Sequence, residues 1–249
     1  MVLADVFELY RKNFKVALSF AILLVFAFVF SLFPNVFVSS GSLFFDFNFN
    51  AYSVEILVLE FAALAIFAAV LAFFVSLTVF SVRKELSTMR VEYYLSEMVQ
   101  KFSSKLFIFF LVYTVLLSLA SFAIVFAGIS PAWSVVLVLA VSAAFFFVPQ
   151  AIVVDEESVE NSVYNSVEFS LKNPRLFLLA AVVPTAMMAV VMSLEFVFDS
   201  FFLLGKFVSL VLALVFVVPF TEMLKTYVYM MKFEIIRHHE KLRPRHNRP

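Results

Sequence analysis

The sequence contains no cysteine, which excludes disulfide bonds and any thiolate metal site. Glycine is rare, with three residues, so alanine and serine must provide the small positions at which helices approach one another closely. The chain also lacks a phosphate-binding glycine-rich loop, a zinc-protease helix motif and a nucleophile elbow. We therefore expect a protein that is not an enzyme and that has no cofactor and no metal site.

Charged residues are scarce as well, at 14% of the chain against about 25% in an average soluble domain, whereas 64% of the residues are hydrophobic. The apolar residues form continuous runs of about the 20 residues that cross a bilayer as a helix. They do not alternate with polar residues, so a closed barrel is not expected. The composition predicts an all-α, polytopic membrane protein, a single integral domain over 1–249. Its six transmembrane helices are predicted at 16–33, 54–82, 105–127, 132–154, 175–198 and 201–220.

The basic residues predict how these helices are oriented. With six spans, all of the 18 basic residues except Lys206 fall on the side of the two termini, or within a few residues of it. The opposite loops, 34–53, 128–131 and 199–200, contain none. By the positive-inside rule, both termini are cytoplasmic and the protein is expected in the cell (plasma) membrane. Because no small-residue cleavage site follows the first apolar run, we expect that run to be a retained span.

The start of one span in each pair carries a basic residue, namely Lys15, Lys105 or Arg175, and an apolar stripe at helical spacing precedes each of them. Each stripe predicts an amphipathic helix in the inner interface, and each basic residue predicts a headgroup contact. Lys105 and Arg175 are 70 residues apart, as are Pro149 and Pro219. We predict three tandem repeats of an interfacial helix and two spans, at about 1–84, 85–154 and 155–240, followed by a basic tail at 241–249.

The third predicted interfacial helix has serines every four residues beside its valine stripe, at Ser158, Ser162, Ser166 and Ser170. A line of small residues allows close approach to another helix. A solvated serine face fits the same spacing, so both interpretations stay open.

The stretch FFFVPQAIVVDEESVENSVYNSVEFSLKNPRLFLL, residues 145–179, joins a span that ends in Pro-Gln, an acidic turn, a serine-rich amphipathic helix and a basic entry into the next span. This pattern resembles the membrane domain attached to some glycerophosphodiester phosphodiesterases, and a broad group of six-span bacterial and archaeal membrane proteins. The resemblance implies only a fold. The phosphodiesterase activity of such proteins belongs to a separate soluble domain, so no catalytic residue is carried onto this chain.

Two charges of opposite sign are predicted at equal depth. Glu60 and Lys206 each lie about six residues into a span from the outer side, roughly 9 Å at 1.5 Å per residue. A charge in the membrane interior costs about 2.5–3.5 kcal/mol on insertion scales, so we predict an ion pair between them. In a transporter such a pair would be a gate or a substrate contact, and in a structural protein it would clamp two units together.

A candidate inner polar site is predicted beside two prolines, which remove a backbone hydrogen bond and kink a helix. Pro149 is followed by Gln150, and Pro219 is followed by Thr221 and Glu222. The alternative is that these kinks serve only the shape of the bundle.

Two segments outside the spans have predictions of their own. In the outer loop 34–53, Phe45, Phe47 and Phe49 alternate with polar residues and the SSGS sequence is typical of a turn, so we expect a short hairpin on the outer interface. Lipid contact, partner docking and a lid are all open roles for it. The tail KLRPRHNRP predicts contact with anionic lipid, and topology explains its charge without nucleic-acid binding.

Together these features predict a non-enzymatic accessory or scaffold protein, or a lipid-associated protein, whose main partner is the lipid bilayer. A protein partner remains open. The alternative is a transporter or channel with a path between the repeat units. A hydrated centre would favour the transporter, and a centre packed with Phe, Leu and Ala would favour the scaffold.

Overall fold

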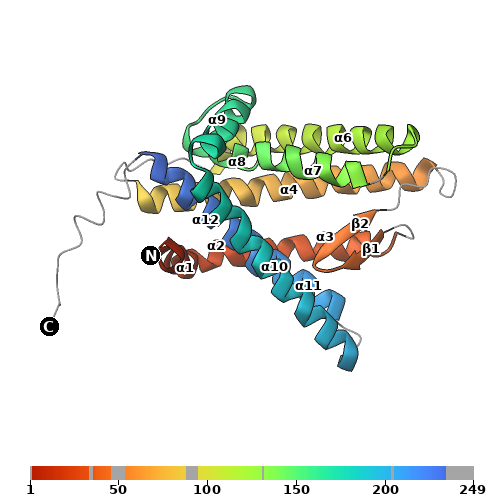
Figure 1. The fold of residues 1–249 in the computed structure, drawn as a ribbon. Coiled ribbons are helices and arrows are strands. Elements are labelled where there is room, and N and C mark those ends of the chain that lie inside the picture. Colours follow the sequence, from red (N-terminus) through yellow and green to blue (C-terminus); the bar gives the residue numbers. More distant parts are fainter. Residues whose placement is uncertain are drawn as a thin grey trace.

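In the computed structural model, the described residues are 2–33, 36–45, 54–87, 95–130, 132–202 and 205–233. They form long helices and a short antiparallel hairpin (Figure 1). The helices long and apolar enough to cross a membrane are Val54–Leu86, Ser96–Ile124, Ala132–Val154, Pro174–Phe201 and Gly205–Met230. The bent pair Val2–Lys12 and Phe14–Phe30 adds a sixth span if it is counted as one. A helical, polytopic membrane fold with five or six candidate spans is therefore confirmed.

The elements follow one another along the chain in two groups. The first group comprises α1 (Val2–Lys12), α2 (Phe14–Ser19), the 3₁₀ turn η1 (Phe20–Ile22), α3 (Leu23–Phe30), β1 (Val36–Ser39), β2 (Ser42–Phe45), α4 (Val54–Leu86), α5 (Leu95–Met98), the π-helical turn η2 (Val99–Ser103) and α6 (Ser104–Phe126). The second group comprises α7 (Ala132–Ala144), α8 (Val148–Val154), α9 (Val159–Lys172), α10 (Pro174–Phe202), α11 (Gly205–Leu212), the π-helical turn η3 (Ala213–Val217), α12 (Val218–Met230) and the 3₁₀ turn η4 (Met231–Phe233).

The outer surface of the bundle is apolar, as a lipid-facing surface must be. On α6, Leu116, Leu119 and Phe122 are 57–61% exposed, although each is a large apolar side chain. Soluble monomers rarely expose contiguous apolar patches larger than a few hundred Å². Phe20 of η1 and Phe147, by contrast, are completely buried in the core.

Two interfacial helices meet their spans through an asparagine. α1 is bent by 70° from the helix that follows it, and Asn13 lies at the bend. Its side chain and its backbone N–H both donate to the carbonyl four residues earlier, and its own carbonyl accepts from the N–H groups three and four residues later. Asn173 has the same set of bonds between α9 and α10. The asparagine ends one helix and begins the next at both places, because its side chain competes for a backbone carbonyl.

The segment before Lys105 differs from these two junctions. Within the described residues, α5, η2 and α6 form one continuous helix from Ser96 to Ile124, so no separate interfacial helix precedes Lys105 there. The predicted apolar stripe also includes residues 91–94, which lie outside the described residues. Three tandem repeats therefore stay a prediction, although the first and third units share a junction.

The last span runs from Gly205 to Met230, and the predicted bounds of 201–220 are wrong. α10 continues to Phe202, and the π-helical turn η3 just before Pro219 lets the helix pass the proline without ending. This span is the most enclosed: 61% of its most apolar stretch is buried, against 6% for Ser96–Ile124. The polar residues after Pro219 therefore face protein rather than water.

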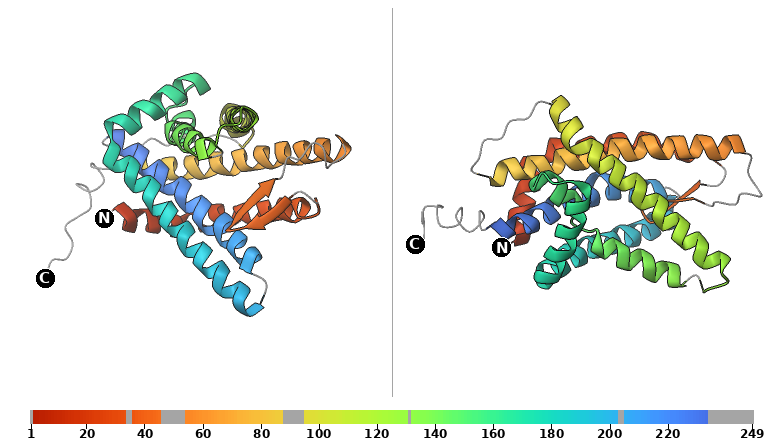
Figure 2. Two further views of the ribbon diagram at one scale, coloured as in Figure 1. Left: turned by 45° about the vertical axis from the view of Figure 1, so that its right-hand side comes forward. Right: turned by 90° about the horizontal axis from the view of Figure 1, so that it is seen from above.

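A β-hairpin interrupts the otherwise helical fold. Ser39 pairs with Ser42, and the two residues between them, Ser40 and Gly41, have φ of 53° and 69°. Positive φ at both positions is what a type I′ hairpin turn requires. The predicted SSGS turn is thus confirmed, and Phe47 and Phe49 lie outside the described residues. Figure 2 shows the hairpin between α4 and the α10–α11 pair, which diverge away from the end of the bundle where α1 begins.

The serine line on α9 packs against the bundle. Ser162 and Ser166 are completely buried, and Ser158 caps the helix by accepting from the backbone of Asn161. Ser166 accepts from the N–H of Phe147 and donates to the carbonyl of Ala144, so it satisfies the backbone where α7 gives way to α8. The close-packing interpretation therefore holds for the two central serines.

Candidate functional site

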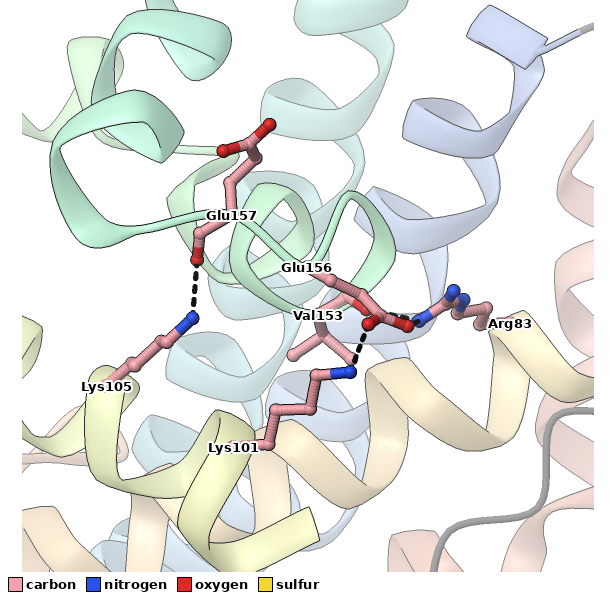
Figure 3. A network of polar contacts seen from close by, with 6 residues as sticks. All are labelled: Arg83, Lys101, Lys105, Val153, Glu156 and Glu157. Atoms are coloured by element: carbon pink, nitrogen blue, oxygen red, sulfur yellow. Dashed lines mark hydrogen bonds and ion pairs between the residues drawn. The ribbon is translucent and has the colours of Figure 1, made fainter. Parts of the chain in front are cut away.

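Polar side chains gather at the end of the bundle where α1 begins and α12 ends, which we call the termini end. The turn between α8 and α9 lies there, and three basic side chains from α4, η2 and α6 hold it (Figure 3). Arg83 donates to the carbonyl of Val153 at 2.7 Å and to the carboxylate of Glu156 at 3.0 Å. Lys101 also binds the Glu156 carboxylate, and Lys105 donates to the carbonyl of Glu157 at 2.9 Å. We call this arrangement the turn clamp.

The turn clamp has a simple electrostatic basis. The last carbonyls of α8 have no partner within the helix and carry the negative end of the helix dipole, which cations stabilise. Glu156 is in the left-handed region, with φ of 60°, a conformation that costs a non-glycine residue roughly 1–2 kcal/mol. Its two cationic partners offset that cost and keep the chain turning from α8 into α9.

A second group, the buried triad, joins α8 to α12. The amide of Gln150 donates to one oxygen of Glu222 at 2.9 Å, and Lys225 binds the other oxygen at 2.8 Å. Gln150 is completely buried, and the side chains of Glu222 and Lys225 are 12% and 8% exposed. The Lys225 ammonium also lies 5.0 Å from the centre of the Phe146 ring, a cation–π distance. The triad is an intramembrane ion pair with both charges partnered.

A shallower contact between the same elements lies closer to the termini end. Tyr229 donates to Asp155 at 2.6 Å, and Lys232 lies 3.8 Å from the same carboxylate oxygen. Tyr229 is seven residues beyond Glu222, about 10 Å along the helix. A polar seam of this length therefore follows the contact between α12 and the α8 region.

α12 and η3 also hold α1. The hydroxyl of Tyr10 donates to the carbonyl of Val215 at 3.0 Å, and Tyr227 donates to Asp5 at 3.0 Å. Val215 lies four residues before Pro219, which has no N–H to bond this carbonyl. The proline thus frees an acceptor inside the last span, and an interfacial helix supplies the donor.

The five residues of the predicted inner polar site are only partly brought together. Gln150 and Glu222 are in direct contact, as the buried triad shows. Pro149 stands in the first turn of α8, and Pro219 follows η3, so both prolines shape the backbone beside the triad. Thr221 instead bonds back to the carbonyl of Val217 on its own helix.

Glu60 and Lys206 do not form an ion pair with each other among the described residues. Glu60 is buried, at 2% exposure, whereas Lys206 is exposed. Because the last helix begins at Gly205, Lys206 lies at the outer end of its span and not six residues inside it. The depth predicted for it is therefore wrong, for the same reason that the span bounds are wrong.

The three predicted headgroup residues have different surroundings. Lys15 and Arg175 are exposed at the first turn of their spans. Lys105 is half-buried and belongs to the turn clamp. On α9, Lys172 binds Glu168 at 2.6 Å, and this hydrogen bond holds the pKa of the Glu168 carboxyl below its usual range.

Several residues of the site are missing from the sequence prediction. Lys225 is placed beyond the sixth span there, although its spacing of three residues from Glu222 is a helical pairing distance. Arg83, Lys101 and Asp155 count only as charges of the inner side. Their partners lie on other elements, 55 to 74 residues away along the chain, and no local spacing reveals them.

Within the described ranges, no group of three or more His, Cys, Asp or Glu side chains could hold a metal ion. The geometry is that of partnered ion pairs that bind elements together.

Comparisons with known proteins add no family to this description. No protein-family model matches the chain, and the searches of curated proteins and of solved structures find no match. The resemblance to the membrane domain of glycerophosphodiester phosphodiesterases therefore stays a prediction.

Proposed function

We propose that the protein is a non-enzymatic accessory or scaffold protein of the cell membrane, with both termini cytoplasmic, that associates with inner-leaflet lipid through α1 and α9. The observation that carries this proposal is the way α9 is held. Its serine face is buried against α7 and α8, and the turn clamp holds its start, while Leu171 and Tyr164 are left 77% and 69% exposed. Large apolar side chains on a rigidly held amphipathic helix suit the headgroup boundary.

Two further features support the same function. On α1, Phe7 is 65% exposed beside the partnered Glu8–Lys12 pair, so this helix also has an apolar flank. The core between the spans is filled by side chains such as Phe20, Phe74 and Ile152, which suits a scaffold more than a transport path. The basic tail adds anionic lipid as a proposed contact.

We also infer that the bundle contains three tandem units. The matching junctions at Asn13 and Asn173 support this for the first and third units. The 70-residue spacing in the sequence supports it for the second and third.

A matched pair of residues on α9 tests the lipid contact. Because the chain has no cysteine, the Leu171→Cys and Lys172→Cys variants can each carry one fluorophore, about 100° apart on the same turn. In nanodiscs with brominated lipids, we expect quenching at position 171 at least about twice that at position 172, because one flank faces lipid and the other faces water. Equal quenching at the two positions would refute the proposed seating of α9.

A transporter or channel is the second candidate, and the buried triad favours it, because charged residues inside a membrane span often mark a pathway. The test is access of water to the triad. A Thr221→Cys variant should resist membrane-impermeant thiol reagents from both sides if the protein is a scaffold. Reaction from one side that changes with conditions would support a path and overturn the scaffold.

A further inference from the structure

We propose that the β1–β2 hairpin is a plug that closes a water-accessible vestibule between α4 and the α10–α11 pair, at the end of the bundle opposite the termini. This inference concerns the far side from α9 and does not depend on the proposed scaffold function.

The tip of the hairpin reaches into the membrane-spanning part of α11 and η3. A Cβ placed on Gly41 would lie 2.7 Å from the Cβ of Ala213, 3.1 Å from the carbonyl oxygen of Ser209 and 3.5 Å from Cε of Met188. Ser209 and Ala213 are four and eight residues inside the span that begins at Gly205, about 6 and 12 Å along its axis. Met188 lies near the middle of α10. The tip therefore lies inside the bundle and not on its outer interface.

Backbone of this kind cannot lie against lipid. A two-stranded sheet leaves unpaired N–H and C=O groups along both outer edges. At hydrocarbon depth, such groups are tolerated only where protein buries them or water reaches them. β1 and β2 pair only with each other among the described strands. The diverging ends of α4 and α10–α11, with the hairpin between them (Figure 2), are where water can enter.

A buried acid in the same region points to the same conclusion. Glu195 lies seven residues beyond Met188, on the same face of α10. It is 7% exposed, and its Oε2 has no hydrogen-bond partner among the described residues. A carboxylate oxygen enclosed in this way needs a solvent molecule or a cation, and water in the vestibule would provide for it.

The hairpin fits closely but is held weakly, as a plug that opens must be. Within the described residues, one hydrogen bond joins the turn to the helices, from the Gly41 N–H to Ser209 Oγ at 3.2 Å. No ion pair between described residues involves the hairpin. The termini end, by contrast, is held by the turn clamp and the buried triad. Opening is therefore expected at the hairpin end.

Two glycines allow a matched test. Gly41 and Gly128 both have positive φ, of 69° and 70°, so alanine strains the backbone equally at both. Only the Gly41→Ala methyl meets other atoms, because nothing lies within 4 Å of a Cβ at Gly128. The reporter is Met188→Cys in the otherwise cysteine-free chain. Val190→Cys is the lipid-facing control, since Val190 is 60% exposed on the same helix.

The measurement is the rate of reaction with a charged, membrane-impermeant thiol reagent, applied separately to each side of sealed vesicles. Met188→Cys should react slowly alone and with Gly128→Ala, and about tenfold faster or more with Gly41→Ala, from the side opposite the termini. Val190→Cys should stay unreactive throughout, because a thiol in lipid does not ionise.

Two results would overturn the proposal. Equal slow rates with Gly41→Ala and Gly128→Ala would show that no water lies behind the hairpin. Fast reaction of Met188→Cys alone would show that the hairpin closes nothing. If Gly41→Ala does not elute as a folded, monodisperse protein, Ser209→Ala takes its place. It removes one hydrogen bond and should speed the reaction about two- to tenfold, and an unchanged rate would again overturn the plug.

Discussion

The buried triad leads to a prediction in which burial alone decides the magnitude. Lys225→Met removes the cation and leaves the Glu222 carboxylate enclosed between α8 and α12, with only the Gln150 amide as a partner. Removing one member of a buried ion pair costs about 3–5 kcal/mol, because the remaining charge is neither solvated nor paired. We expect the free energy of unfolding to fall by this amount.

The chain provides its own control for this prediction. Lys172 and Glu168 on α9 form a pair of similar length, 2.6 Å against 2.8 Å, but their side chains are 70% and 34% exposed. An exposed helical pair of this kind contributes about 0.3–0.5 kcal/mol. Lys172→Met should therefore cost several-fold less than Lys225→Met, although it removes the same group.

The assay is unfolding of the purified protein in mixed micelles, by titration with a denaturing detergent, with Glu222→Gln added as the second member of a double-mutant cycle. The Lys225→Met and Glu222→Gln double variant should recover most of the loss, because no charge is left buried and Gln150 keeps a hydrogen-bond partner. If Lys225→Met costs no more than Lys172→Met, or if the double variant is as unstable as Lys225→Met, then the pair is not buried as described.

Three more substitutions test other contacts in the same unfolding assay. Ser166→Ala leaves two buried backbone groups unpaired and should cost about 1–3 kcal/mol, against less than about 0.5 for Ser170→Ala; equal costs would contradict the bridging role. Tyr10→Phe should cost about 1–3 kcal/mol, and less with Pro219→Ala, which restores an N–H for the freed carbonyl; additive effects would contradict this link. Glu156→Gly should be about 1 kcal/mol more stable than Glu156→Ala, because glycine adopts the left-handed conformation without strain; equal stabilities would contradict the strain at this turn.

The sequence predicts the membrane fold well because the signals for it are local. A span is recognised from about 20 consecutive residues, and the Asn13 and Asn173 junctions are recognised from a few residues on each side. The turn at Ser40 and Gly41 is equally local, since two adjacent residues supply the positive φ values. The bounds of the last span are wrong, because hydropathy falls after Pro219 although the helix continues for eleven more residues, to Met230.

The candidate site could be predicted only in part. Proline beside polar residues marks Gln150 and Glu222 as unusual inside spans, and the structure shows them in contact. Nothing local indicates that Arg83 holds the turn after α8, or that Tyr10 bonds to the last span. The Glu60–Lys206 hypothesis rests on depth along two helices, and depth says nothing about which helices are neighbours.

The chain alone determined that it lies in a membrane, where its spans run and where its interfacial helices turn, because burial in lipid and helix capping act over short stretches of residues. Tertiary structure alone decided that Gln150 meets Glu222 across 72 residues, that Tyr10 meets Val215 across 205, and that the hairpin lies between α4 and α10–α11. These contacts depend on how whole helices pack, and a lipid-facing surface of interchangeable Phe, Leu and Val residues leaves that choice to a few enclosed polar groups.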